Sequence, residues 1–306
     1  MNNYVLAVDL GATKAAIAIV SEEFEIHEKV EVSTGKETSE KIWYSIEQTV
    51  QKLLANQKGN LLGVGIGSAG PINSNLGEIS PVNIPSWRNF PIIQKFKSIT
   101  NSNEVRLHGD AIAFAHAEYK LGAGQNSNNM LGLVVSTGIG GGLILNQKLF
   151  LGESGNSGYF GHHTISFEGK KCDCGRVGCV ETYASGPMMV EYAKSIGWNN
   201  QHWDFKSLAE DARNGNSFAI SSIDRGTKAL ASAIVNVLDI LDIKTVVIGG
   251  GVSEAGDIFW KPLNTHVQKE ATFAGFLGEI QLKPAKLLRD AGIFGAALAI
   301  LDSERY

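Results

Sequence analysis

Three cysteines form the most specific chemical pattern in the chain. Cys172, Cys174 and Cys179 have the spacing C-x-C-x(4)-C, and the rest of the sequence contains no cysteine. His162 lies ten residues before the first of them, and His163 competes with it as a fourth ligand. Three thiols and one imidazole are a ligand set that tetrahedral structural Zn²⁺ takes. The odd number and the clustering therefore predict a metal site and argue against a disulfide framework.

A second pattern, D-x-G-x-T, lies between two apolar stretches near the N-terminus. It contains Asp9, Gly11 and Thr13 and is followed by Lys14. Glycine lets backbone N–H groups approach phosphate oxygens, and Asp9 can hold Mg²⁺ directly or through water. Thr13 and Lys14 would add a hydroxyl and a positive charge. A plain hairpin turn accounts for the same residues about equally well.

Two further glycine clusters each follow an apolar strand. The loop from Ser136 to Gly142 has four glycines and two hydroxyls, whereas a simple hairpin needs one or two glycines. Neither cluster matches the P-loop or the dinucleotide-binding pattern. We expect these loops to line a nucleotide cleft between two similar domains, through Thr137, Gly138, Gly140, Gly249, Gly250 and Gly251.

Asp110 stands directly after Gly109 at the end of a short strand. Phosphoryl transfer to an alcohol needs a carboxylate that accepts the hydroxyl proton, and Asp110 suits that role. The residues alone leave a second interpretation equally open, in which Asp110 only caps a helix that starts at Ala111.

Apolar periodicity predicts the elements that position these residues. The predicted elements are strands over 4–9 and 15–20, alternation through Phe24, Ile26 and Val30, a helix over 42–54, a strand over 62–66, a strand–turn–strand over 131–145, a helix over 227–241, a strand over 245–248 and a helix over 293–301. The pattern over 131–145 parallels that over 6–20, which indicates one fold unit used twice.

Length and composition limit the class of protein. A chain of 306 residues suggests two domains. The formal net charge of −4 argues against a nucleic-acid partner. No stretch of about 18 apolar residues and no basic leader is present, so we expect a cytoplasmic protein without a membrane partner.

These motifs together resemble the ROK family of repressors and sugar kinases, within the actin, hexokinase and Hsp70 superfamily. The resemblance runs nearly end to end and is carried by LAVDLGATK, GIGSAGP, NIPSWRNFP, GDA, VVSTGIGGGLIL, GHHTI, CDCGRVGCVETYASGP and VVIGGGV. It implies an α/β fold of two ribonuclease H-like (actin-like ATPase) domains with an interdomain cleft and a zinc-binding loop. The expected limits are 1–120 with a C-terminal helix at about 290–306, and 121–289.

The resemblance also implies roles for individual residues. It makes Asp110 the catalytic base and His162, rather than His163, the fourth zinc ligand beside the three cysteines. The implied sugar-binding positions are Asn83, Gly109, Asp110, Tyr159, His162 and Glu181. The implied cofactors are ATP, Mg²⁺ and a structural Zn²⁺, and the partners are a sugar, ATP and identical subunits in a homodimer or homotetramer.

Two positions depart from the family pattern. Glucokinase-like members carry Asn where this chain has Gly109 and Glu where it has Tyr159. Both missing groups would contact sugar hydroxyls, so the departures favour N-acetylmannosamine or another modified hexose over glucose. The expected reaction is transfer of the γ-phosphoryl group to a hexose hydroxyl, O6 above all, with glucokinase as the alternative.

Two other classes of function were weighed. Family repressors carry a helix-turn-helix before the first phosphate loop, and here that loop starts within ten residues of Met1. A sugar-binding protein without kinase activity is disfavoured by the intact Asp9, Thr13 and Asp110. The choice between ATP and polyphosphate as phosphoryl donor stays open.

Overall fold

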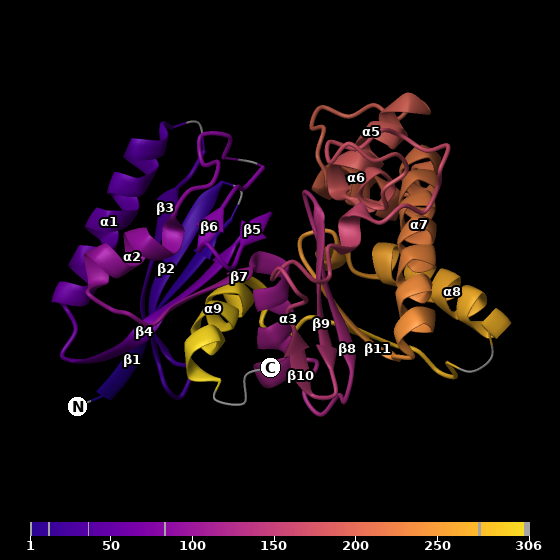
Figure 1. The fold of residues 1–306 in the computed structure, drawn as a ribbon. Coiled ribbons are helices and arrows are strands. Elements are labelled where there is room, and N and C mark those ends of the chain that lie inside the picture. The colour runs from indigo at the N-terminus through magenta and orange to yellow at the C-terminus, as the bar shows by residue number, and fades with distance from the viewer. Residues whose placement is uncertain (1, 12, 36, 83, 275–276, 303–306) are drawn as a thin grey trace. The chain divides into compact units, whose positions relative to one another are not determined.

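The computed structural model describes residues 2–302 apart from 12, 36, 83, 275 and 276 (Figure 1). The chain divides into two compact units, each with its own packing. The first unit comprises Met1–Leu121, Gly142–Gly158 and Arg289–Tyr306, and the second comprises Gly122–Gly141 and Tyr159–Leu288. Residues 142–158 thus group with the first unit, whereas the limits expected from the sequence place them with the second part of the chain.

The first unit is built on a five-stranded sheet with the order β3-β2-β1-β4-β7. The strands are β1 (Asn2–Leu10), β2 (Lys14–Ser21), β3 (Ile26–Ser33), β4 (Gly59–Ser68) and β7 (Val105–Gly109). β1, β2 and β3 are antiparallel neighbours, whereas β4 and β7 run parallel to β1. The predicted alternation holds from Ile26 onward, but Phe24 lies in the preceding turn with φ 63° instead of in a strand.

Helices cover both faces of this sheet, which explains why its central strands are apolar on both sides (Figure 1). The helices are α1 (Ser39–Ala55), α2 (Ile92–Thr100), α3 (Asp110–Leu121) and α9 (Ala291–Leu301). Leu6 and Val8 pack in one core with α1 and α2, and Val5 and Ala7 pack in a second core with α9. α9 is apolar nearly all round because α3 packs on it as well.

A buried ion-pair cluster joins α3 to the residue that ends α9. His116 Nε2 lies 2.8 Å from Asp302 Oδ2, and Lys120 Nζ lies 3.1 Å from the same oxygen. Burial opposes ionisation of Asp302, but the bonds from His116 and Lys120 outweigh it and hold its pKa well below the usual range. The cluster fixes α3, whose first residue is Asp110.

Short elements complete the first unit. They are β5 (Ile72–Asn73), β6 (Glu78–Ile79) and β10 (Lys148–Phe150). The ring of Trp87 is fully buried and stacks on Phe90 at 4.2 Å, so Trp87 braces this loop region and is not available to stack on a sugar.

The second sheet has the order β10-β9-β8-β11-β12. Its further strands are β8 (Met130–Val135), β9 (Ile139–Leu145), β11 (Thr245–Gly249) and β12 (Gln281–Pro284), and the chain passes from one unit to the other within β9. Counted in chain order, both sheets have the strand order 3-2-1-4-5, with strands 4 and 5 parallel to strand 1. This agreement matches the internal repeat inferred from the sequence.

The helices of the second unit lie beside β8, β9 and β11. They are η1 (Phe160–His162), α4 (Glu181–Ala184), α5 (Gly186–Ser195), α6 (Phe205–Arg213), α7 (Ser217–Leu241), η2 (Ser253–Ala255) and α8 (Asp257–Ala274), and η3 (Leu288–Asp290) leads back to the first unit. The predicted helix over 227–241 is the second half of α7, which packs along α8. Across residues 2–302, as far as they are described, no helix is long and apolar enough to cross a membrane.

Candidate active site

Asp9 lies near the end of β1, and Asp110 lies at the junction of β7 and α3. The parallel strands β1, β4 and β7 end at the same edge of the sheet, so the two carboxylates face the same region of the first unit. Burial, followed by the charge of Asp110, raises the pKa of Asp9 from 3.8 to about 6. The two groups are thus close enough to resist simultaneous ionisation.

Asp110 satisfies a backbone donor at the start of α3, as the capping interpretation expects. It is the first residue of α3, and its Oδ1 accepts a hydrogen bond from the N–H of Ala111 at 2.7 Å. Its side chain is exposed, yet desolvation by the surrounding protein raises its pKa. The carboxylate remains accessible to solvent, so its pKa is raised by the protein atoms around it and not by complete burial. A carboxylate of raised pKa at a strand end is suited to accept a proton.

The carboxylate of Asp9 lies against the first turn of α9. A Cβ at Gly292 would overlap with this carboxylate, so only glycine fits there. The sequence analysis did not identify Gly292, although the glycine that opens the apolar segment 293–301 was a usable signal.

The first loop has the tight geometry of a hairpin. Gly11 N–H donates to Lys14 C=O at 3.0 Å, and Thr34 N–H donates to Thr13 C=O at 3.0 Å. Lys14 Nζ pairs with Glu31 Oε1 at 2.5 Å on the exposed side of β2 and β3. The loop therefore presents Asp9, Gly11 and Thr13 at the sheet edge, whereas the charge of Lys14 is engaged by Glu31.

The second glycine loop is held from α4. Oε2 of Glu181 accepts a hydrogen bond from the N–H of Ile139 at 2.7 Å. A Cβ at Gly138 would lie 2.7 Å from the same oxygen, so a larger residue there would displace the Glu181 carboxylate. The carbonyl oxygen of Ser136 also accepts a hydrogen bond from the N–H of Gly186 at 2.9 Å. Thr137 and Gly138 are thus placed by α4 and α5, and Gly140 is already part of β9.

A cavity of about 570 Å³ opens beside this loop in the second unit. Its volume is typical of a small-molecule site. Gly251 of the third glycine cluster lines this cavity. Gly250 has φ 91° and lies against the backbone of Val135. The remaining wall comes from α5, α6 and η2, and its residues are Ser136, Thr137, Gly186, Pro187, Val190, Trp203, Asp204, Phe205, Lys206, Ala209, Arg213, Val252, Glu254 and Ala255. The sequence analysis found the glycine loops but not Trp203, Phe205 or Arg213.

The sulfur and nitrogen atoms of the predicted metal ligands converge. Among the described residues, one ligand atom each from His162, Cys172, Cys174 and Cys179 lies within 4.8 Å of all the others. His162 Nδ1 is 3.5 Å from Cys172 Sγ, and the Sγ atoms of Cys174 and Cys179 are 3.6 Å apart. Tetrahedral ligands at zinc distances of about 2.0–2.3 Å are separated by roughly 3.5–3.8 Å, so the cluster fits such an ion.

His163 is not a member of this cluster. Its Nδ1 lies 2.9 Å from the carbonyl oxygen of Phe160. The neighbouring Cys179 is buried, and burial together with the other two thiols raises its pKa to about 12. A cation at the cluster would reverse that shift, because a metal holds its thiolate ligands deprotonated.

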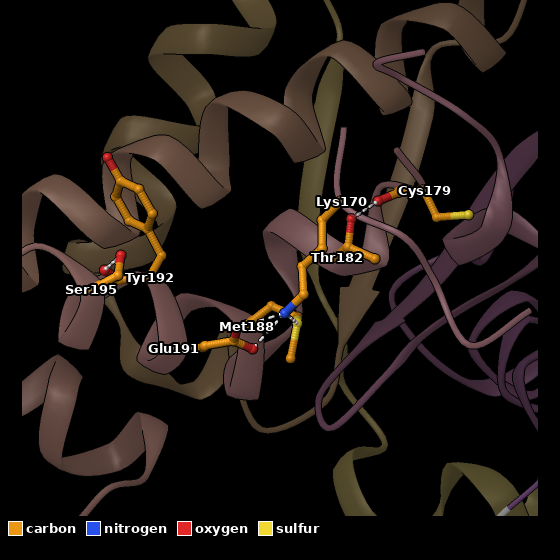
Figure 2. A network of polar contacts seen from close by, with 7 residues as sticks. All are labelled: Lys170, Cys179, Thr182, Met188, Glu191, Tyr192 and Ser195. Atoms are coloured by element: carbon orange, nitrogen blue, oxygen red, sulfur yellow. Dashed lines mark hydrogen bonds and ion pairs between the residues drawn. The ribbon is translucent and has the colours of Figure 1, made fainter. Parts of the chain in front are cut away.

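The loop that carries Cys172, Cys174 and Cys179 is attached to the neighbouring helices at two points (Figure 2). Thr182 Oγ1 donates to the carbonyl oxygen of Cys179 at 2.8 Å. Lys170 Nζ reaches both carboxylate oxygens of Glu191 on α5 at 2.6 Å. Figure 2 shows the Cys179 thiol pointing away from Lys170, so the two attachments do not occupy the ligand atom.

The implied sugar-binding positions are distributed over both units. Gly109 ends β7, and a Cβ there would meet only Ile112, at 3.6 Å. Tyr159 is 45% exposed, and its ring centroid lies 5.1 Å from that of His162. Asn83 lies outside the described residues.

A family model matches residues 5–303, and its description is the ROK family. The chain belongs to the ROK family. The match covers both sheets with their glycine loops and the loop that carries the three cysteines.

The relatives of this ROK protein are named after two different sugar substrates. A glucokinase from Thermotoga maritima is 33% identical and covers 97% of each chain. An N-acetylmannosamine kinase from Haemophilus influenzae is 34% identical over 97% of this chain and 95% of its own. A solved ROK family glucokinase from Streptomyces griseus, in complex with glucose and AMPPNP, has a TM-score of 0.83 and 28% identity over 98% of this chain and all (100%) of its own.

Proposed function

We propose that this ROK protein is an ATP-dependent sugar kinase that transfers the γ-phosphoryl group to a hexose hydroxyl. The observation that carries the proposal is the pair Asp9 and Asp110, two carboxylates at one sheet edge with raised pKa values. The nucleotide-sized cavity beside Ser136, Thr137 and Gly251 supports it. The relatives named as glucokinase and N-acetylmannosamine kinase, and the solved complex with glucose and AMPPNP, agree with it.

Asp110 acts as the base in this proposal. Its exposed carboxylate accepts the proton of the attacking hydroxyl, and its fixed position at the start of α3 orients that hydroxyl. We assign the 6-hydroxyl as the acceptor because it is the one primary alcohol of an ordinary hexopyranose.

Asp9 would hold Mg²⁺, directly or through a water molecule. When bound, Mg²⁺ neutralises the developing negative charge on the transferred phosphoryl group. The raised pKa of Asp9 fits this role, because burial and the repulsion of Asp110 both oppose a negative charge that a bound cation would stabilise. The hydroxyl of Thr13 and the backbone of the glycine loops would bind the phosphates.

The cluster of His162, Cys172, Cys174 and Cys179 would hold a structural zinc ion. Four protein ligands leave no open position for a reacting water, so the ion would not take part in the chemistry. Glu181 follows Cys179 by two residues and also holds the second glycine loop. The ion would therefore fix the segment that presents both Glu181 and His162 to the sugar.

We further propose that N-acetylmannosamine or another modified hexose is preferred over glucose. Gly109 leaves space at the end of β7, and Tyr159 offers a neutral hydroxyl on an exposed ring instead of a carboxylate. Such a pair accommodates an acyl substituent better than it recognises a bare hydroxyl. Glucokinase is the second candidate, because a glucokinase is about as similar to this chain as the N-acetylmannosamine kinases are.

A panel assay tests the proposed function. Purified protein is given ATP and Mg²⁺ with glucose, mannose, N-acetylglucosamine or N-acetylmannosamine, and ADP release and the mass of the product are followed. We expect sugar-dependent ADP release and a monophosphate of at least one hexose. Sugar binding without ADP release from any sugar would instead identify a sugar-binding protein.

A further inference from the structure

Trp203 is an aromatic side chain at the cavity that the proposed reaction does not use. It precedes α6 and lines the cavity on which Thr137 of the glycine loop also lies. It keeps 46% of its surface exposed, although indole is among the side chains that gain most from burial. An exposed indole at the wall of a cavity is a natural surface for a flat ligand group.

The ring of Trp203 packs against a second indole. Trp198 meets it edge to face, with ring centroids 5.5 Å apart and an interplanar angle of 87°. Trp198 is only 2% exposed, and its Nε1 donates to Asp211 Oδ2 on α6 at 2.8 Å. The indole of Trp203 is therefore supported by a buried, hydrogen-bonded neighbour.

The ammonium group of a lysine also packs on the Trp203 ring. Lys194 Nζ, near the end of α5, is 3.9 Å from the ring centroid, within the range of a cation–π contact. Lys194 and Trp198 together hold the indole, which also lines the cavity. The ring is thus positioned before any ligand arrives, which reduces the entropy lost on binding.

The other walls of the cavity favour a planar apolar group with a polar tail. Val190, Phe205 and Val252 are apolar, whereas Ser136 and Thr137 offer hydroxyls at the glycine loop. A nucleobase matches the first group and a phosphate chain matches the second. Inorganic polyphosphate has no planar group, so it would gain nothing from Trp203.

We propose that Trp203 is the aromatic wall on which the nucleobase of the phosphoryl donor stacks, so that this cavity selects a nucleotide over inorganic polyphosphate. The inference rests on the proposed kinase function for the identity of the ligand as a phosphoryl donor. Stacking itself requires no turnover, so it is measured with ADP alone.

Calorimetric titration of the full chain with ADP tests the proposal. Trp203→Ala should weaken ADP binding about 10- to 100-fold, the range that base stacking on an aromatic side chain supplies. Trp203→Phe keeps a ring and should stay within about threefold of the wild type. Binding of inorganic tripolyphosphate should be equal in all three proteins.

Fluorescence gives an independent readout with a matched control. Trp260 does not line the cavity, and its Nε1 donates to Ser253 C=O at 2.9 Å. ADP should quench the emission of the wild type and of Trp260→Phe, but not that of Trp203→Phe. We expect the Trp203 variants to fold, because this side chain is half exposed. Their melting temperatures test that expectation.

Three results would overturn the proposal. The first is unchanged ADP affinity in a folded Trp203→Ala protein, and the second is no ADP binding by the wild type. The third is an equal loss of ADP and tripolyphosphate affinity, which would make Trp203 a structural residue of the cavity. A wild type that binds ADP through Trp203 but phosphorylates no sugar would instead refute the kinase proposal and leave the stacking intact.

Discussion

The side chain of Glu181 holds the backbone of Ile139 through a hydrogen bond of 2.7 Å between Oε2 and the N–H group. The two residues are 42 positions apart, and they connect α4, which follows the loop of the three cysteines, with the second glycine loop. Because Ile139 is buried, its N–H has no ready access to water as a replacement partner.

We therefore expect Glu181→Ala to reduce the free energy of unfolding by about 1–3 kcal/mol, the cost of leaving a buried donor unsatisfied. Glu181→Gln retains a carbonyl oxygen that can accept the bond and should cost less than about 1 kcal/mol. Chemical denaturation measures both, with the exposed Glu168→Ala as the control. Equal stability of Glu181→Ala and the control would show that the bond does not hold the loop.

The raised pKa of Asp9 makes the stability of the protein depend on pH. A carboxyl that binds its proton more tightly in the folded state stabilises the protein most below the unfolded pKa of 3.8, and this contribution is lost as the pH rises through about 6. A shift of about two units corresponds to roughly 2–3 kcal/mol.

Asp9→Asn should remove this penalty. We expect the variant to melt at a higher temperature than the wild type at pH 8, and at nearly the same temperature at pH 4, while losing its activity with Mg²⁺ and ATP. Melting curves from pH 4 to 8 test this, and Asp239→Asn on the exposed surface of α7 serves as the control. Parallel pH profiles for Asp9→Asn and wild type would contradict the assignment.

The metal cluster predicts a specific pattern of metal content. Wild type and His163→Ala should each carry about one zinc ion per chain, because His163 is bonded to Phe160 and not to the cluster. His162→Ala and Cys174→Ser should lose it and unfold at lower temperature. Elemental analysis by mass spectrometry decides the matter, and retention of zinc by His162→Ala with loss by His163→Ala would reverse the ligand assignment.

Sugar preference should follow Gly109 and Tyr159. We expect the wild type to use N-acetylmannosamine or another modified hexose at least about tenfold better than glucose in kcat/KM, or about 1.4 kcal/mol of transition-state binding. The double variant Gly109→Asn with Tyr159→Glu should shift this ratio toward glucose. The space beside Gly109 accepts a side chain, since the nearest atom to a Cβ is 3.6 Å away.

Steady-state kinetics on both sugars measure this shift. Tyr44→Glu on α1 is the matched control, because Tyr44 is also an exposed tyrosine but lies away from the site. An unchanged ratio in the double variant, or efficient use of glucose alone by the wild type, would show that other residues set the preference.

The sequence located the parts of the site that depend on local pattern. Asp9 and Asp110 were identifiable because each ends a strand whose apolar run is plain in the sequence. The residues of the cysteine–histidine cluster were identifiable because no other cysteine competes with Cys172, Cys174 and Cys179. The strand–turn–strand over 131–145 was identifiable in the same way, because its glycine turn repeats that of the first sheet.

The remaining features depend on contacts between distant segments. Nothing near Lys14 in the sequence indicates that Glu31 would take up its charge, since that pairing depends on the register of β2 and β3. The bond between Glu181 and Ile139 and the exposure of Trp203 likewise arise only when α4 and α6 are packed. Propensity and periodicity carry no information on such contacts.

The central claim is that Asp110 accepts the proton of a sugar hydroxyl during phosphoryl transfer. The most direct test is the turnover of Asp110→Asn with the preferred sugar, alongside sugar affinity and melting temperature. The account predicts an intact fold, retained sugar binding and a kcat lower by roughly 10²–10⁴-fold, the usual contribution of a positioned base. Turnover of Asp110→Asn near that of the wild type would contradict it.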